Sequence, residues 1–384
     1  MKFVAPASCS GAGTGGGCTW ADSTSGTATP SAINVARIEW DERMPQHSTM
    51  IPAGSDAAYV AARHRAARLD RSDRGRIVVS GADRASYLQG LLTNDVVALK
   101  SGEGCYAAYL TAQGRMITDL HVYELGDLML LTMAGDVTAT VLAKFDQLVF
   151  SEDVQLGDVT GTFAQIAVVG PDAARAVSIA LGAVEADALA ALPEHGNMRT
   201  AWAGGPAIVT RVTDTGEPGF DVFVDRSQVT ALTAALDAAG VIEAGEATAE
   251  AIRIETGVPA FHRDMDEETI PLEANIESRA ISFSKGCYVG QEVVIRVLHR
   301  GHGRVARKLV GLLVDGTQVP PPGSVIRSGD REIGRVTSST RSPALERPIA
   351  LGYVHRDFLE PGTKVTVEDA SAEVTTLPFV SRQA

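Results

Sequence analysis

The chain has 384 residues, of which 45% are hydrophobic and 21% are charged, so its composition is that of an ordinary globular protein. This length allows two or three domains, each with its own hydrophobic core. The formal net charge of −13 argues against nucleic acid as a partner, because an acidic surface repels the phosphate backbone.

Residues 1–50 are dominated by Gly, Ser, Thr and Ala, and they lack the apolar core of a secretory signal. We expect this extension to be disordered or to precede the true start, with Met44 and Met50 as alternative starts. No apolar run in the chain approaches the roughly 18 to 20 residues of a membrane-spanning helix, so we expect no membrane association.

Hydrophobic periodicity and Gly/Pro turns predict an α+β body over residues 51–300, built from two mixed units at about 51–150 and 151–300. The first unit is expected to hold helices at 56–70, 81–96 and 136–148, a strand at 75–81, and three strands within 104–133. The second is expected to hold a strand and a helix start within 163–177, a hairpin at 206–225, and helices at 227–239 and 247–259.

From residue 301 to 384 the pattern changes to short alternating strands separated by closely spaced Gly/Pro turns. That pattern is typical of a small antiparallel β-barrel. We therefore expect a separate C-terminal barrel after the body.

The four cysteines, Cys9, Cys18, Cys105 and Cys287, form no pair with the spacing of a metal site or a disulfide framework. We expect no metal site and a reducing, cytoplasmic compartment. Cys287 differs from the others because it lies in "KGCYVGQE", between Gly286 and Gly290.

Several stretches together resemble the glycine-cleavage T-protein (aminomethyltransferase) superfamily over roughly residues 60–380. These are "LQGLLTNDV", "AQGRMITDLHVYEL", "TGEPGFDVFV", "AIRIETGVPAFHRDMDEETIPLEANI" and "KGCYVGQE". The last of them is similar to the hallmark of the YgfZ-type folate-binding proteins, which are linked to iron–sulfur cluster maintenance. The resemblance implies a T-protein-like body arranged around a central folate pocket, with tetrahydrofolate or a one-carbon derivative as cofactor.

The resemblance places Asp119 beside the folate nitrogen N5, where a carboxylate stabilises developing positive charge. On composition alone Asp119 is a turn residue at a strand start. Relatives carry a pair of acids at this point, and here the first is replaced by Thr118. Catalysis is therefore less secure than folate binding.

The resemblance assigns Asp221 to the hydrogen-bond donor edge of the pterin and Arg253 to the lining of the folate pocket. From the residues alone, the alternative for Asp221 is an acid on the solvent-facing side of a strand. The alternative for Arg253 is an ordinary surface residue. Relatives usually carry Glu where this chain has Asp221. Their aromatic residue seven positions earlier is replaced by Asp214, which removes a stacking wall for the pterin.

The octapeptide gives Cys287 as a candidate reactive thiol, with a packed, inert cysteine as the alternative. Lys285 is expected to favour the thiolate, and a helix beginning after Gly286 would lower the thiol pKa further. The remaining candidates would shape or cover this folate-binding segment; they are Tyr288, Gly290, Gln291 and Glu292.

Two functions follow from the resemblance. The first is a monomeric, tetrahydrofolate-binding accessory protein whose partners are iron–sulfur client or assembly proteins. The second is a folate-dependent aminomethyltransferase or other one-carbon transferase. A scaffold that binds a client protein without folate is a third possibility, and the octapeptide favours the first function.

Overall fold

The computed structural model describes residues 57–299 and 304–381. The expectations for residues 1–50 therefore lie outside the described residues. Within the part of the chain that is described, no helix is long and apolar enough to cross a membrane.

The first sheet has five antiparallel strands in the order β3-β4-β5-β2-β6. Their bounds are β2 Gly75–Ser80, β3 Gly104–Leu110, β4 Met116–Glu124, β5 Leu128–Met133 and β6 Gln155–Asp158. Helices α2 (Arg84–Leu91) and α3 (Thr138–Asp146) pack on this sheet through a buried cluster that includes Tyr87, Leu88 and Phe145. The three strands expected within 104–133 are confirmed.

The second sheet has six strands in the order β11-β1-β7-β10-β9-β8. Their bounds are β1 Ala67–Asp70, β7 Phe163–Val169, β8 Asn197–Trp202, β9 Gly205–Val212, β10 Gly219–Asp225 and β11 Ile242–Glu243. Only the β1–β11 pair is parallel. The sheet thus carries the hairpin expected at 206–225, and the mixed α+β body is confirmed.

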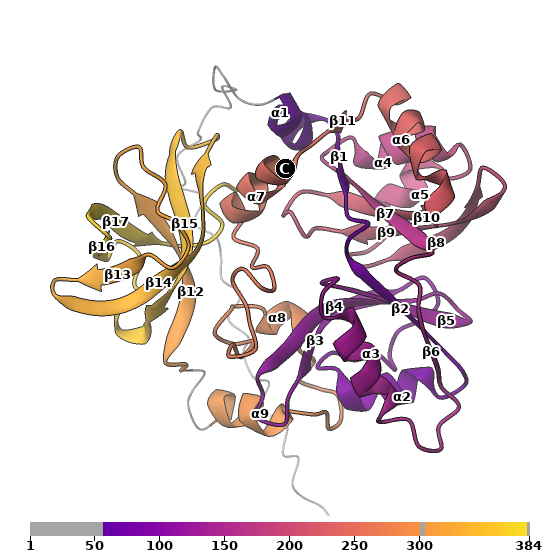
Figure 1. Cartoon of the computed structure of the whole chain (residues 1–384), viewed down its shortest axis with the longest axis horizontal. Helices are drawn as coiled ribbons and strands as arrows, with labels where there is room; N and C mark the ends of the chain where they lie inside the picture. The colour runs from indigo at the N-terminus through magenta and orange to yellow at the C-terminus, as the bar shows by residue number, and fades with distance from the viewer. Residues whose placement is uncertain (1–56, 300–303, 382–384) are drawn as a thin grey trace, which may run out of the picture. The chain divides into compact units, whose positions relative to one another are not determined.

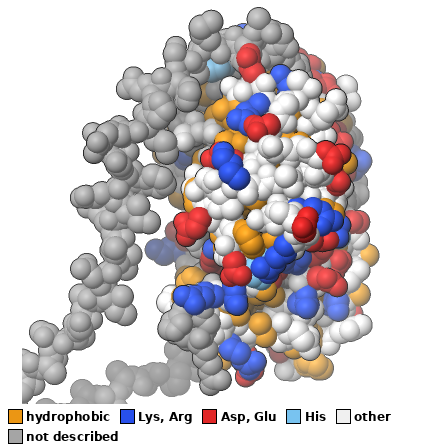
Figure 2. Space-filling view, turned by 90° about the vertical axis from the view of Figure 1, so that its left-hand side faces the viewer, with side chains coloured by type: hydrophobic (Ala, Val, Ile, Leu, Met, Phe, Trp, Pro, Cys, Tyr) orange, Lys and Arg blue, Asp and Glu red, His pale blue; other side chains and the backbone are white. Residues whose placement is uncertain are grey.

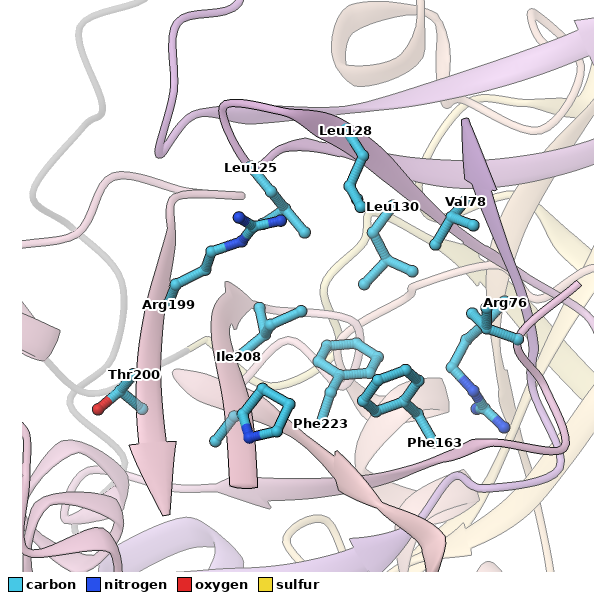
Figure 3. Close-up of a pocket in the computed structure, with 13 residues that line it drawn as sticks. Arg76, Val78, Leu125, Leu128, Leu130, Phe163, Arg199, Thr200, Ile208 and Phe223 are labelled. Atoms are coloured by element: carbon cyan, nitrogen blue, oxygen red, sulfur yellow. The ribbon is translucent and has the colours of Figure 1, made fainter. Parts of the chain in front are cut away.

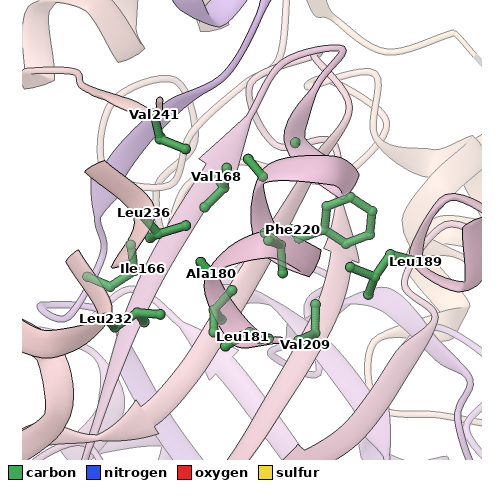
Figure 4. Packing of buried hydrophobic residues seen from close by; sticks show 14 of the residues in the cluster. Ile166, Val168, Ala180, Leu181, Leu189, Val209, Phe220, Leu232, Leu236 and Val241 are labelled. Carbon is green, nitrogen blue, oxygen red and sulfur yellow. The ribbon is translucent and has the colours of Figure 1, made fainter. Parts of the chain in front are cut away.

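Helices α4 (Ala173–Leu181), α5 (Ala186–Ala190) and α6 (Val229–Ala238) bury their apolar sides against the second sheet. Figure 4 shows Ile166, Val168 and Phe220 of the sheet facing Leu181 and Leu236 of the helices. Fully burying one such side chain stabilises the fold by about 1.5–3 kcal/mol.

The helix expected at 56–70 is shorter in the structure, because α1 (Ala57–His64) ends before β1 begins. The segment 67–70 pairs with β7 on one side and begins its pairing with β11 on the other. Backbone pairing on two sides outweighs the helix propensity of this Ala- and Arg-rich stretch. Asp83 stands at the N-cap position of α2, but its side chain makes no capping hydrogen bond to the helix. Its carboxylate accepts a hydrogen bond from Asp153 N (2.8 Å).

The C-terminal strands form a closed barrel in the order β12-β15-β14-β13-β16-β17 (Figure 1). Their bounds are β12 Arg307–Val314, β13 Val325–Ser328, β14 Arg331–Ser342, β15 Arg347–His355, β16 Lys364–Val367 and β17 Ala370–Thr375. Aliphatic side chains such as Leu312, Ile326 and Val374 fill its interior. Over the barrel, Figure 2 shows acidic and basic side chains interspersed with small separate hydrophobic groups.

Helix α7 (Glu246–Glu255) joins the body to the barrel through its last residue, Glu255. The buried Glu255 carboxylate accepts hydrogen bonds from Tyr59 Oη (2.7 Å), from Arg63, and from Ser342 of β14. Its backbone oxygen also accepts from Phe379 N (2.8 Å). Two short helices, α8 (Glu277–Ala280) and α9 (Gln291–His299), complete the described body.

Candidate functional site

A polar cleft of about 400 Å³ lies where the two sheets, α7 and α8 meet. Its lining comes from the β1–β2 loop, from β3 and β4, from the loops that flank β8 and β9, and from α7 and α8. The charged and hydrogen-bonding residues that line it are Asp70, Arg71, Asp73, Arg74, Tyr106, Asp119, His121, Glu194, His195, Thr213, Asp214, Thr215, Glu246, Glu250, Arg253 and Arg279.

Asp119 lies on the wall of this cleft, on strand β4, as expected for the folate acid. Tyr106 of β3 donates a hydrogen bond from Oη to Asp119 Oδ2 (2.7 Å). Burial, and then the neighbouring Asp119 charge, hold the pKa of Tyr106 well above its usual range. Thr118 is fully buried and takes no part in the lining, so Asp119 is the only acid of this strand start at the cleft.

Asp221 of β10 is buried and does not line the cleft. Its two oxygens accept from Arg71 Nη1 (3.3 Å) and from Gln165 Nε2 (2.7 Å). The solvent-facing alternative for Asp221 is therefore wrong. A direct contact with a pterin stays a prediction, and it would require the ligand to displace Arg71.

Asp214 contacts the guanidinium of Arg71 from the cleft side. The sequence had marked Asp214 only as the replacement of an aromatic residue that relatives carry. Its Oδ2 accepts from Arg71 Nη1 (3.2 Å), and its Oδ1 lies 3.2 Å from His121 Nε2. Burial opposes ionisation of Asp214, but the charges of His121, Arg71 and Arg74 hold its pKa well below the usual range. The signal in the sequence was the Asp-x-His spacing of Asp119 and His121, because strand residues two apart share one face.

Arg253 lines the cleft, but its guanidinium is fully used by the protein. It donates to Asp264 Oδ2 (2.6 Å), to both Glu250 oxygens (2.9 and 2.7 Å), to Val258 O (2.6 Å) and to Ser338 Oγ (2.9 Å). Because a guanidinium has five N–H donors, none remains for a ligand. The surface alternative for Arg253 is wrong, and its contact with folate remains a prediction.

Lys285 holds the octapeptide on the first sheet's helix α2 and the loop that follows it. Its Nζ donates three hydrogen bonds of 2.7 Å, to the carbonyl oxygens of Gln89, Leu92 and Asn94. These bonds use all three ammonium donors, and they turn the charge toward the loop. Burial lowers the pKa of Lys285 to about 8, against the opposing charges of Asp95 and Cys105.

Cys287 is exposed and free, and it does not line the cleft. It lies four residues before α9 begins, so it is not part of the first turn of that helix. By contrast, burial raises the pKa of the Cys105 thiol to about 12. Cys287 is therefore the accessible thiol of the two cysteines that the structure describes, and the packed alternative does not apply to it.

Two further residues of the octapeptide, Tyr288 and Gly290, are closely packed. Tyr288 is buried, its ring lies 5.2 Å from Lys285 Nζ, and burial raises its pKa to about 12. Gly290 has φ +85°, and a Cβ on it would meet Thr111 O at 2.6 Å. Open space surrounds the corresponding atom of Gly286. Gly290 is therefore required by the turn, whereas Gly286 is not.

Gln291 and Glu292 begin α9, and neither residue lines the cleft. The Glu292 carboxylate lies in the first helical turn, where a negative charge is favourable. Neither side chain has a hydrogen bond to another residue of the described ranges. Their expected role in holding the turn thus receives no support from the geometry.

A second cavity, of about 330 Å³, is apolar and lies between the two sheets (Figure 3). Leu125, Leu130 and Val78 face Phe163 and Phe223 across it. The cavity lacks acidic and nucleophilic groups, so the polar cleft is the candidate site.

Over residues 57–299 and 304–381, no group of three or more His, Cys, Asp or Glu side chains is arranged to hold a metal ion.

Comparisons with known proteins agree with this architecture. The family model for the GCVT N-terminal domain matches residues 33–285, and the model for the glycine cleavage T-protein C-terminal barrel domain matches residues 307–381. The solved structure of the glycine cleavage system aminomethyltransferase T from Bartonella henselae superposes with a TM-score of 0.77. It is 24% identical, over 85% of this chain and 89% of that one.

Named relatives point the same way. A protein of Rubrobacter xylanophilus named aminomethyltransferase is 34% identical, over 86% of this chain and 87% of its own length. Another of the same name, from Streptomyces coelicolor, is 32% identical, over 85% and 89%. A chloroplastic putative transferase of Arabidopsis thaliana is 29% identical, over 82% and 71%. With both of its domains matched in order, the chain belongs to the glycine cleavage T-protein family.

Proposed function

We propose that the chain binds tetrahydrofolate in the polar cleft and transfers a one-carbon unit, as an aminomethyltransferase-type enzyme. The observation that carries this proposal is the Asp119 carboxylate on the cleft wall, positioned by Tyr106 Oη at 2.7 Å. The relatives named aminomethyltransferase support the reaction class.

The groups of the cleft fit a folate. Arg74 lines the cleft, and its guanidinium suits a carbonyl or carboxylate oxygen of the ligand. Asp214 places an ionised carboxylate on the cleft wall, where its remaining lone pairs could accept an N–H group of a pterin. The volume of about 400 Å³ lies within the usual range for small-molecule sites.

Tetrahydrofolate supplies ring nitrogens that accept and carry the one-carbon unit. Asp119 would stabilise the positive charge that develops beside those nitrogens, because an ionised carboxylate in a partly buried cleft is already oriented. Asp214 and Arg74 would hold the pterin, and the surrounding protein would limit the access of water.

The test combines binding and turnover. We expect calorimetry to detect tetrahydrofolate binding, and an aminomethyl-loaded lipoyl carrier protein to yield methylene-tetrahydrofolate. Asp119→Asn should lower kcat by about 10²–10³-fold, since it removes one electrostatic contact to the reacting atoms. The exposed Asp127→Asn serves as the matched control and should leave kcat unchanged.

Absence of both heat and a thermal shift with tetrahydrofolate would rule out any folate function. Binding without turnover would instead remove only the transferase reading.

A second function is favoured by one specific observation, the exposed Cys287 outside the cleft. In this proposal the chain is a tetrahydrofolate-binding protein of the YgfZ type that supports iron–sulfur enzymes, with Cys287 as its reactive thiol. The thiol would act on a partner protein, because a cluster usually needs about four ligands and one cysteine cannot hold it.

Genetic complementation separates the two functions. After deletion of the gene, iron–sulfur enzyme activities are measured in cells that carry wild type, Cys287→Ser or Asp119→Asn. Loss with Cys287→Ser alone supports the accessory role, and full rescue by Cys287→Ser contradicts it.

A further inference from the structure

A second acid–base pair lies next to Asp119 on the same face of β4. His121 follows Asp119 by two residues, and both line the cleft. His121 Nε2 lies 3.2 Å from Asp214 Oδ1, and the side chains are 6% and 24% exposed. The second oxygen of Asp214 is fixed by Arg71.

The remaining ring nitrogen of His121 is the chemically free one. Nδ1 has no hydrogen bond to a described residue, and it is absent from the buried side-chain atoms that lack partners. Nδ1 therefore keeps some accessible surface, and the residue that carries it lines the cleft. A carboxylate on one imidazole nitrogen and a free acceptor on the other is the arrangement of a positioned general base.

The surroundings of the ring favour this use. Its neighbours are Tyr106 of β3 (5.2 Å), Tyr123 of β4 (6.0 Å) and His195 of the loop before β8 (5.1 Å), measured between ring centroids. The charged groups facing the same part of the cleft are Arg71, Arg74, Asp119, Asp214 and Arg279.

Two of these neighbours have fixed charge states at neutral pH. Burial, and then His121, lower the pKa of His195 to about 3, so His195 stays neutral. Asp214 stays ionised, because its pKa lies well below the usual range despite its burial. An ionised carboxylate 3.2 Å from Nε2 favours the tautomer with its N–H on that nitrogen and orients the ring of His121.

We propose that His121 is the proton acceptor of the cleft and that Asp214 positions it, an inference that rests on the proposed transferase function. As an amine nitrogen of the folate attacks the donor carbon, the nitrogen lone pair forms the new C–N bond. The bond from carbon to the leaving group of the aminomethyl donor breaks, and both of its electrons stay with the leaving group. The nitrogen then gives its N–H proton to His121 Nδ1.

A purely structural ion pair is the alternative, and the chain contains one for comparison. His262 Nε2 lies 3.2 Å from Asp136 Oδ2, the same separation, but neither residue lines the cleft. Both partners are also more exposed, at 36% and 67%. Asp136→Asn is therefore the matched control for Asp214→Asn.

The first test uses protein without ligand, so it does not depend on turnover, and its first measurement needs only the wild type. Nitrogen-15 NMR of the histidine side chains should show His121 with its proton on Nε2 and with Nδ1 unprotonated at neutral pH. In Asp214→Asn the ring proton should no longer be confined to Nε2, whereas Asp136→Asn should leave the tautomer of His121 unchanged. A proton on Nδ1 of the wild-type ring, or an unchanged tautomer in Asp214→Asn, overturns the proposal.

The second test measures transfer. His121→Gln should lower kcat by about 10²–10⁴-fold, with tetrahydrofolate affinity changed less than about twofold. His121→Ala should recover part of the rate when imidazole is added, whereas Asp136→Asn should retain the wild-type rate.

The outcomes distinguish the two proposals. Wild-type turnover that His121→Gln leaves unchanged overturns the role of His121 alone. Tetrahydrofolate binding without wild-type turnover overturns the transferase function and this inference together, whatever the tautomer of His121.

Discussion

At the residue scale, the cleft is organised by Arg71, whose guanidinium lies between two carboxylates. Asp221 lies behind it and is buried, and Asp214 lies in front of it and reaches the cleft. A buried cation with two acidic partners holds both carboxylates in fixed orientations. The acid available to a ligand is consequently Asp214, which the relatives' pattern does not mark.

His195 gives this cleft a pH dependence. Burial lowers its pKa to about 3 from an ordinary value of 6.5, so the unfolded chain binds a proton between these values and the folded chain does not. Above pH 6.5 His195 is neutral in both the folded and the unfolded chain, so it does not change the free energy of unfolding there. As the pH drops from 6.5 toward 3, the free energy of unfolding falls. The expected slope approaches about 1.4 kcal/mol per pH unit.

His195→Asn should remove this slope. Asparagine suits the site because residue 195 has φ +61°, a conformation that Asn tolerates. Urea unfolding of both proteins from pH 4.5 to 7 provides the measurement, in a range above the titration of Asp214. Parallel stability curves for the two proteins would show that His195 does not stay neutral.

At the element scale, the turn before α9 depends on close packing against the β3–β4 turn. Gly290 approaches Thr111 O and Leu110 Cβ, and Gly114 approaches Val293 Cβ from the other side. Lys285 supplies the second attachment through its three carbonyl acceptors. The octapeptide is thus a fixed loop that presents Cys287 outward.

Two glycines of this octapeptide provide a matched pair of substitutions. Gly290→Ala should cost about 1–3 kcal/mol, because the new Cβ would lie 2.6 Å from Thr111 O at φ +85°. Gly286→Ala should change stability by less than about 0.5 kcal/mol, because open space surrounds its Cβ position. Chemical denaturation compares the two variants, and equal losses would contradict the described turn.

At the scale of the whole molecule, α7 links the body to the barrel through two residues of one motif. Arg253 joins Asp264 and Ser338, while Glu255 joins Arg63 and Ser342. These side chains are buried, so each depends on its partners to offset the loss of water. Both charged residues of the Arg-x-Glu motif, Arg253 and Glu255, therefore have a structural role in connecting the body to the barrel.

Arg253→Met should cost about 3–5 kcal/mol, because it leaves the fully buried Asp264 carboxylate without its cation. Arg347→Met is the control, since its ion pair with Asp315 is exposed and contributes about 0–1 kcal/mol. Guanidinium denaturation measures both variants. A loss at Arg253 no larger than that at Arg347 would show that the joint is not a stabilising element.

The sequence was sufficient for the mixed body and the barrel, because strand alternation and turn residues are local signals. It was insufficient for α1 and β1, where pairing with distant strands overrides helix propensity. The partners of Asp221, Arg253 and Lys285 were likewise invisible, since each lies far away in the chain or is a backbone carbonyl. Long-range hydrogen bonds leave no periodic trace in the sequence.

The closed barrel has a consequence for how this family member meets other proteins. Each of its six strands has a neighbour on both sides, so its ladder offers no vacant backbone edge. A visiting chain cannot extend such a sheet by adding a strand of its own. A partner protein would therefore have to bind the barrel through side-chain contacts. The two open sheets differ, because each ends in strands with one unpaired side: β3 and β6 in the first, β8 and β11 in the second.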